Sequence, residues 1–119
     1  MRDYRKIKAW QTADELAVKI YETTRQFPKE EMYGLTSQMR RAAVSAAANI
    51  AEGSARAHQK EYLQFLFIAK SSARELEYYI HLSNKLGYFK ETEFKELEKM
   101  STESIHILFG LIRAVSNQN

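Results

Sequence analysis

The sequence predicts an all-α protein folded as an antiparallel up-and-down four-helix bundle, and three observations support this prediction. Apolar residues recur at steps of three and four along four segments, and no segment shows the alternation typical of a strand. The connections between these segments are short, which favours antiparallel neighbours. With 119 residues, of which 45% are hydrophobic, the chain has room for one core, so we expect a single four-helix bundle domain over residues 1–119.

The first two expected helices differ in composition. The first extends from about Ala9 to Thr24 and ends before Phe27, because the residue before a proline is pushed away from helical backbone angles. The second starts near Thr36, which we expect to be its N-cap, and stops at Gly53, which can adopt the left-handed C-terminal conformation at low cost. Three of the residues on its core-facing side are alanines, which allow close helix approach; the side consists of Leu35, Met39, Ala42, Ala43, Ala46 and Ile50.

The third and fourth expected helices each carry a heptad-like seam of core residues. The third extends from about Gln59 to Leu86 and stops at Gly87, and the fourth extends from about Thr92 to Ser116. The third seam consists of Tyr62, Leu66, Ala69, Ala73, Leu76, Ile80 and Ser83. The fourth consists of Phe94, Leu97, Ser101, Ser104, Leu108, Leu111 and Val115.

The second helix is apolar on two sides, which indicates self-assembly. Val44, Ala48 and Ala51 form a second apolar strip opposite the core face. In a bundle this small, such a strip needs a cover, and another copy of the chain is the expected one. We expect Phe67 and Tyr78 of the third helix to join this oligomer interface. The open alternative is that the alanines serve helix propensity on a solvated face.

A narrow polar stripe lies between the two apolar sides of the second helix. We expect it to form a hydrogen-bonded, charge-paired network that sets helix register, because a buried Arg or Asn needs partners. A ligand or catalytic pocket is the alternative. The network consists of Arg41, Ser45, Asn49 and Glu52, with Glu75 of the third helix as a candidate partner.

Basic residues gather on the outer side of the third helix, although the whole chain carries a net charge of only +3. Cations can follow a phosphate backbone and aromatic rings can stack on unpaired bases, so this face is a candidate site for RNA or single-stranded DNA. The alternative is a solvated face on which Arg74 pairs with Glu77 while Phe67 and Tyr78 are buried between subunits. The candidate nucleic-acid-binding residues are Arg56, Lys60, Lys70, Arg74 and Lys85.

Several classes of chemistry lack support in the sequence. The chain has no cysteine, and Glu103 with His106 is the only Glu-x-x-His pair, on the side of its helix away from the core. We therefore expect no metal, no cofactor and no enzymatic activity. We also expect a cytoplasmic protein without membrane contact, because the longest uncharged run, Ala42 to Ala51, is far shorter than the roughly 18 residues of a membrane span.

One combined motif resembles the signature of four-helix bundle proteins related to those encoded in 23S ribosomal RNA intervening sequences. It consists of Gln38-Met39-Arg40-Arg41-Ala42, then Ser45, then Asn49-Ile50-Ala51-Glu52-Gly53. Supporting matches include Phe27-Pro28 and Tyr33-Gly34-Leu35 before it, and Lys60-Glu61-Tyr62, Phe65-Leu66 and Glu75-Leu76 after it. The resemblance extends from about Lys8 to Ile112, and Ser71 departs from it where relatives often have glycine.

This resemblance implies a ring-shaped homopentamer without catalytic activity. The similar accessory protein of diversity-generating retroelements works with a reverse transcriptase and nucleic acid, so the resemblance implies those partners too. We therefore expect a self-assembling accessory or scaffold protein that associates with nucleic acid. The competing hypothesis is a protein-binding adaptor whose basic excess is incidental.

Overall fold

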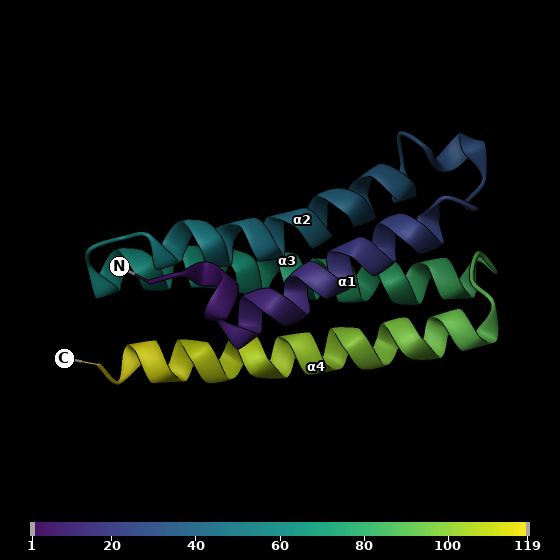
Figure 1. Ribbon diagram of the computed structural model, residues 1–119. Coiled ribbons are helices and arrows are strands. Elements are labelled where there is room, and N and C mark those ends of the chain that lie inside the picture. Colours follow the sequence, from purple (N-terminus) through teal and green to yellow (C-terminus); the bar gives the residue numbers. More distant parts are fainter. Residues whose placement is uncertain (1, 119) are drawn as a thin grey trace.

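The computed structural model describes residues 2–118, and every regular element in that range is helical. The long helices are α1 (Lys8–Thr24), α2 (Leu35–Ser54), α3 (Gln59–Lys85) and α4 (Glu91–Ser116). There are also two short 3-10 helices (Figure 1): η1 (Tyr4–Lys6) precedes α1, and η2 (Lys29–Glu31) lies in the connection between α1 and α2. The prediction of an all-helical fold with four helices is confirmed.

The four helices lie side by side along a body of 47 × 24 × 20 Å (Figure 1). α1 and α3 each pack against both α2 and α4. Polar contacts show which helix ends meet. Gln26, just after α1, donates to the Glu93 carboxylate in the first turn of α4 at 2.8 Å. At the other end, Gln59 in the first turn of α3 donates to the carbonyl of Val115 near the end of α4.

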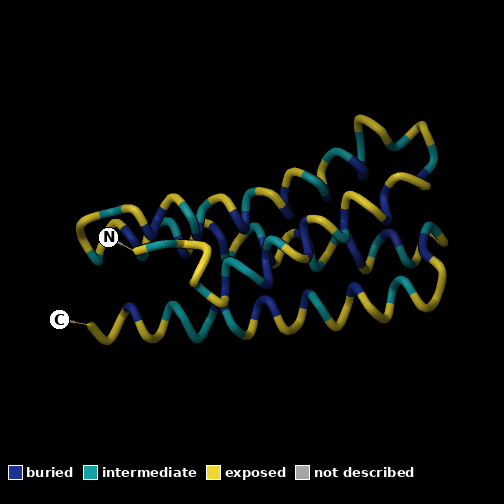
Figure 2. The backbone as a smooth tube through the Cα atoms, in the orientation of Figure 1, coloured by how far each residue is buried: buried dark blue, intermediate teal, exposed yellow. Residues whose placement is uncertain are grey.

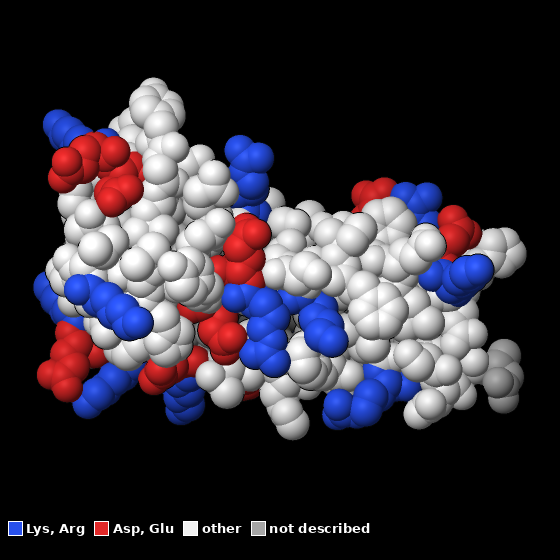
Figure 3. Space-filling view, turned by 180° about the vertical axis from the view of Figure 1, so that it is seen from behind, with Lys and Arg blue, Asp and Glu red and all other residues white. Residues whose placement is uncertain are grey.

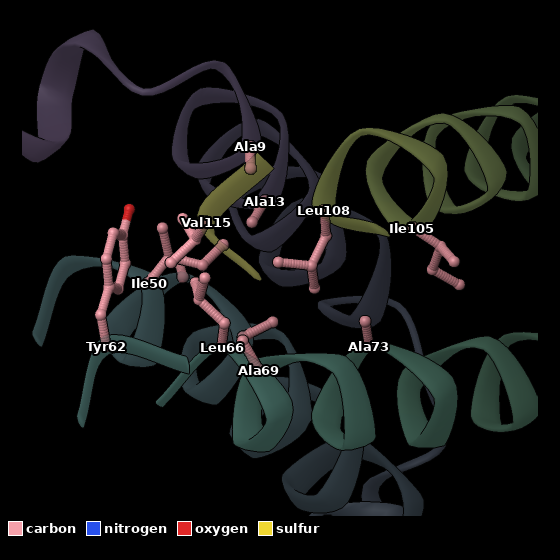
Figure 4. Close-up of a cluster of buried hydrophobic side chains, with 12 residues drawn as sticks. Ala9, Ala13, Ile50, Tyr62, Leu66, Ala69, Ala73, Ile105, Leu108 and Val115 are labelled. Carbon is pink, nitrogen blue, oxygen red and sulfur yellow. The ribbon is translucent and has the colours of Figure 1, made fainter. Parts of the chain in front are cut away.

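The core follows the seams that the sequence predicts. Every residue of the α3 seam is buried, from Tyr62 to Ser83. In α4, Phe94 and Leu111 are only half-buried, and Ile105 joins the core instead. Figure 2 shows the buried positions turned towards the inside of the bundle. Figure 4 shows one end of the core, where side chains from all four helices meet around Leu66 and Leu108.

Both predicted caps of α2 are wrong, although the helix begins and ends within one residue of the predicted positions. Thr36 is not the N-cap, because α2 begins at Leu35 and Thr36 is buried in its first turn. The backbone N–H of Leu35 instead donates to the Glu31 carboxylate at 3.2 Å, so a side chain from η2 satisfies the start of the helix.

Gly53 does not end α2 in a left-handed conformation. It lies inside the helix and is buried, and among residues 2–118 the only positive φ is that of Gly87, at 80°. A Cβ atom on Gly53 would lie 2.7 Å from the Cβ of Phe65 and 3.1 Å from the Cδ1 of Tyr62. The glycine therefore allows α2 and α3 to approach each other closely, and the left-handed cap belongs to α3.

Candidate functional site

The second apolar side of α2 is exposed on the single chain. Val44 is 45% exposed, Ala48 is exposed and Ala51 is half-buried. The neighbouring α1 adds Val18 and Tyr21, which are 55% and 41% exposed. The outer side of these two helices therefore presents apolar side chains to solvent in one protomer.

The centre of the polar stripe forms a hydrogen-bonded link between α2 and α3. The hydroxyls of Ser45 and Ser72 lie 2.8 Å apart. The Asn49 amide donates to the Ser45 carbonyl at 2.8 Å and to its hydroxyl at 3.1 Å. All three side chains are half-buried, so the link is well placed to hold the two helices in register.

The charged members of the expected network lie outside this link. Glu52 pairs with Arg56 at 2.5 Å, whereas Arg41 and Glu75 are exposed and form no ion pair within residues 2–118. The expectation that Arg41 is buried is wrong, because it is exposed at the edge of a cleft between α1, the connecting loop and α2. Glu75 lies near Tyr79, whose pKa is raised first by burial and then by the Glu75 carboxylate.

Two of the cations on the outer face of α3 contact other side chains of the protomer, and two form no ion pair within residues 2–118. Lys60 and Lys85 are exposed and form no ion pair in the described part of the chain. The Lys70 ammonium lies 4.6 Å from the centre of the Phe109 ring, and the Arg74 guanidinium lies 5.2 Å from it. Arg74 also pairs with Glu77 at 3.0 Å, as the solvated-face alternative expects.

Arg56 lies apart from that face. Its guanidinium pairs with Glu52 and stacks over the Phe65 ring at 4.7 Å. Arg2 donates to the backbone carbonyls of Ser54 and Arg56 at 3.1 and 3.0 Å. The start of the chain is therefore docked on the α2–α3 turn. Local sequence patterns do not predict this contact, because it joins residues more than fifty positions apart.

Exposed aromatic side chains accompany the cations of α3. Phe67 is 48% exposed and Tyr78 is 61% exposed. Figure 3, viewed from the side of α3, shows Lys and Arg side chains interspersed with uncharged surface and with Asp and Glu side chains. The helical spacing predicts aromatic rings and cations on the outer side of α3, and Phe67 and Tyr78 are exposed there in the structure.

Two of the three histidines, His81 and His106, line a groove between α3 and α4, whereas His58 directly precedes α3. His81 lies 3.6 Å from the Glu98 carboxylate, and the exposed Glu103 and His106 line the same groove. The predicted outward position of His106 is confirmed. Within residues 2–118, no three His, Asp or Glu side chains are close enough together to hold a metal ion. None of the helices in that range has the length and hydropathy required to span a bilayer.

Comparisons with known proteins agree with this geometry. A crystal structure of a protein of unknown function from the S23 ribosomal protein family of Bacteroides thetaiotaomicron matches with a TM-score of 0.79 and 24% identity, over 87% of this chain and 97% of that one. That likeness supports the fold. No curated protein matches the sequence. The family model described as 23S rRNA-intervening sequence protein matches residues 5–110, and the chain therefore belongs to the 23S rRNA-intervening sequence protein family.

Proposed function

We propose that this chain is a non-enzymatic, self-assembling up-and-down four-helix bundle in the cytoplasm that acts as a nucleic-acid-associated accessory or scaffold protein. Exposed aromatic residues of α3 lie among cations, while an apolar strip of α2 lies exposed elsewhere on the same protomer. This combination is the observation that carries the proposal. The α2 strip and the aromatic residues of α3 are two different surfaces for assembly, and the cations beside those aromatic residues can bind a polyanion.

Assembly joins the α2 strip of one copy to the Phe67 and Tyr78 patch of the next. Two different patches on one protomer make a heterologous contact, which closes into a ring when the rotation between copies permits it. A homopentamer is the ring that the sequence resemblance implies. Burying these side chains removes apolar surface from water, which is the main driving force for association.

The assembly is tested by replacing Ala48 with glutamate. Ala48 is exposed, so the substitution leaves the core of the protomer intact while it places a charge in the proposed interface. We expect light scattering to report a multimer for the native chain and a particle near the protomer mass of 13.9 kDa for Ala48→Glu. The matched control is Ala114→Glu, at an exposed alanine of α4. A native chain that remains a monomer at micromolar concentration would refute the assembly.

Nucleic-acid binding uses phosphate contacts from the cations around the α3 patch. Lys60 and Lys85 form no ion pair in residues 2–118, so their charges are available without breaking an existing contact. Repetition of the face around a ring combines several weak contacts into stronger binding. Binding driven by phosphate contacts weakens as salt rises, because neutralised phosphates release counterions.

Fluorescence anisotropy with a structured RNA and a single DNA strand, across a salt series, tests this proposal. We expect the double variant Lys60→Gln and Lys85→Gln to bind more weakly and to show a shallower salt dependence. The control is Lys95→Gln, whose native lysine is engaged with Glu91 at 3.1 Å on α4. Salt-independent binding, or unchanged binding by the double variant, would contradict the role of this face.

A protein-binding adaptor is the second candidate, and the intramolecular contacts of Lys70 and Arg74 favour it. Because these cations already lie against Phe109 and Glu77, two of the four candidate cations on α3 have interaction partners within the protomer. In this alternative, a protein partner docks on α3, and a reverse transcriptase is the partner that the resemblance suggests. Absence of binding to both nucleic acids at low salt, together with intact assembly, would favour the adaptor.

A further inference from the structure

A cleft of about 610 Å³ opens at one end of the bundle. It lies beside the loop in which η2 connects α1 to α2, at the upper right of Figure 1. Its walls are the last turn of α1, the connecting loop and the first two turns of α2. Every ionisable acid or base that lines it, apart from the Tyr21 phenol, is a cation: Arg25, Lys29, Arg40 and Arg41. The cleft is separate from the outer face of α3, and it combines positive charge with hydroxyl groups and apolar surface.

Arg40 is held in place by neutral partners. Its Nε donates to the Thr24 hydroxyl at 2.9 Å, and its guanidinium lies 4.6 Å from the centre of the Tyr21 ring. The side chain is half-buried, and no carboxylate pairs with it within residues 2–118. Its position is therefore fixed while its charge remains uncompensated, as in a site that is preorganised for an anion.

The other cations of the cleft also lack carboxylate partners in the described chain. Arg25, Lys29 and Arg41 are exposed and take part in none of its ion pairs. The nearby Glu31 is occupied elsewhere, because its carboxylate accepts hydrogen bonds from the Leu35 backbone and from the Tyr88 hydroxyl at 3.2 and 2.8 Å. Four like charges around one cleft repel one another, and a bound anion relieves that repulsion.

The remaining lining indicates which anion fits. Thr36 and Ser37 bring hydroxyl groups from the first turn of α2, and Tyr21 and Met32 bring partly exposed apolar surface. Arginine suits phosphate because its planar fork can donate two parallel hydrogen bonds. A volume of this size accommodates a ligand as large as a nucleotide.

We propose that this cleft binds a phosphorylated ligand of nucleotide size, with its phosphate on Arg40 and Arg41 and its flat ring against Tyr21 or Met32. The proposal does not depend on the role of the α3 face. The same chemistry is offered by a free nucleotide and by the terminal phosphate of a nucleic-acid strand. The probes are therefore inorganic pyrophosphate, adenosine monophosphate, and one short DNA strand prepared with and without a 5′-phosphate.

The experiment is isothermal titration calorimetry, which measures the affinity of the full chain for each probe at low salt. We expect the phosphorylated probes to bind, and we expect Arg40→Gln to weaken their binding by about tenfold or more, because it removes charge-assisted hydrogen bonds. Arg40 also contacts Thr24 and Tyr21, so a second variant, Arg25→Gln with Lys29→Gln, tests the site at exposed positions. The control is the α3 double variant, Lys60→Gln with Lys85→Gln, which should bind pyrophosphate and adenosine monophosphate like the native chain.

The possible outcomes separate the sources of phosphate and the two proposals. Stronger binding of adenosine monophosphate than of the strand indicates a free nucleotide, and stronger binding of the 5′-phosphorylated strand than of its 5′-hydroxyl form indicates a strand end. Loss of pyrophosphate and adenosine monophosphate binding only in the α3 double variant would overturn the cleft proposal and support the α3 face. No binding of any probe at millimolar concentration, or equal binding by native chain and cleft variants, would overturn it as well.

Discussion

Replacing Gly53 with alanine tests how closely α2 and α3 pack. The added Cβ would lie 2.7 Å from the Cβ of Phe65, an atom joined directly to the α3 backbone, and 3.3 Å from the Tyr62 carbonyl oxygen. Rotation of a side chain cannot relieve the Cβ contact, so the helices must move apart. Overpacking of this kind costs about 1–3 kcal/mol. Alanine regains about 1 kcal/mol of helix propensity. Because the clashing Phe65 atom is fixed to the backbone, we expect the overpacking cost to lie in the upper part of that range, and therefore a net loss of about 1–2 kcal/mol in the free energy of unfolding.

The assay is urea unfolding followed by circular dichroism at fixed protein concentration, since assembly affects apparent stability. Gly110→Ala is the matched control. Gly110 also lies in a long helix, but the nearest atom to its added Cβ is the Nη2 of Arg113, at 3.8 Å. It should gain helix propensity without a clash and become more stable by about 0.5–1 kcal/mol. If Gly53→Ala were as stable as the native chain or more stable, the close-approach argument would be refuted.

Three further predictions follow from single contacts. Ser101→Ala should raise the melting temperature, because the buried Ser101 hydroxyl has no hydrogen-bond partner within residues 2–118, and an unsatisfied group costs about 1–3 kcal/mol; a lower melting temperature would contradict this reasoning. Asn49→Ala should lower the free energy of unfolding by about 1 kcal/mol in a urea titration, through loss of its bonds to Ser45, and an unchanged value would leave the α2–α3 link without energetic weight. The hydrogen bond from the Lys90 backbone lowers the pKa of Glu93 below 4.5, so the carboxylate stabilises the fold above that pH and this contribution is lost as the pH falls further. The native chain and Glu93→Gln should therefore differ in melting temperature at neutral pH, and the difference should disappear in acid. A difference that stays constant from neutral pH to pH 3 would contradict this role of the Glu93 carboxylate.

The spacing of apolar residues predicted the α3 core correctly, because buried positions recur with the period of the α-helix. A residue every three or four positions returns to the same side, so the seam from Tyr62 to Ser83 can be read without knowing the neighbouring helices. The same rule placed Val44 and Ala48 outside, and both are exposed. In α4 the rule was less complete, because the buried side is wide enough to include Ile105 beside the seam.

The end of α2 shows where local rules failed. Glycine suits both a left-handed cap and a close contact between helices, and its sequence neighbours do not distinguish these roles. Only the position of Phe65 on α3 shows that Gly53 serves the contact. Arg56 was predicted only as a nucleic-acid-binding cation, and its contacts with Glu52 and with the Phe65 ring at the α2–α3 turn could not be read from local spacing.

The amino-acid sequence by itself determined the helices, their inward seams and the family, because these depend on spacing along one chain and on a local motif. The tertiary structure decided which charges are paired and which are left without partners. Arg74 meets Glu77 within its own helix, but the Phe109 ring that it also faces comes from α4. Arg40 is held by Thr24 and Tyr21 of α1, and its cleft exists only where two helices and a loop come together. Contacts across helices depend on packing distances, and a one-dimensional pattern does not contain them.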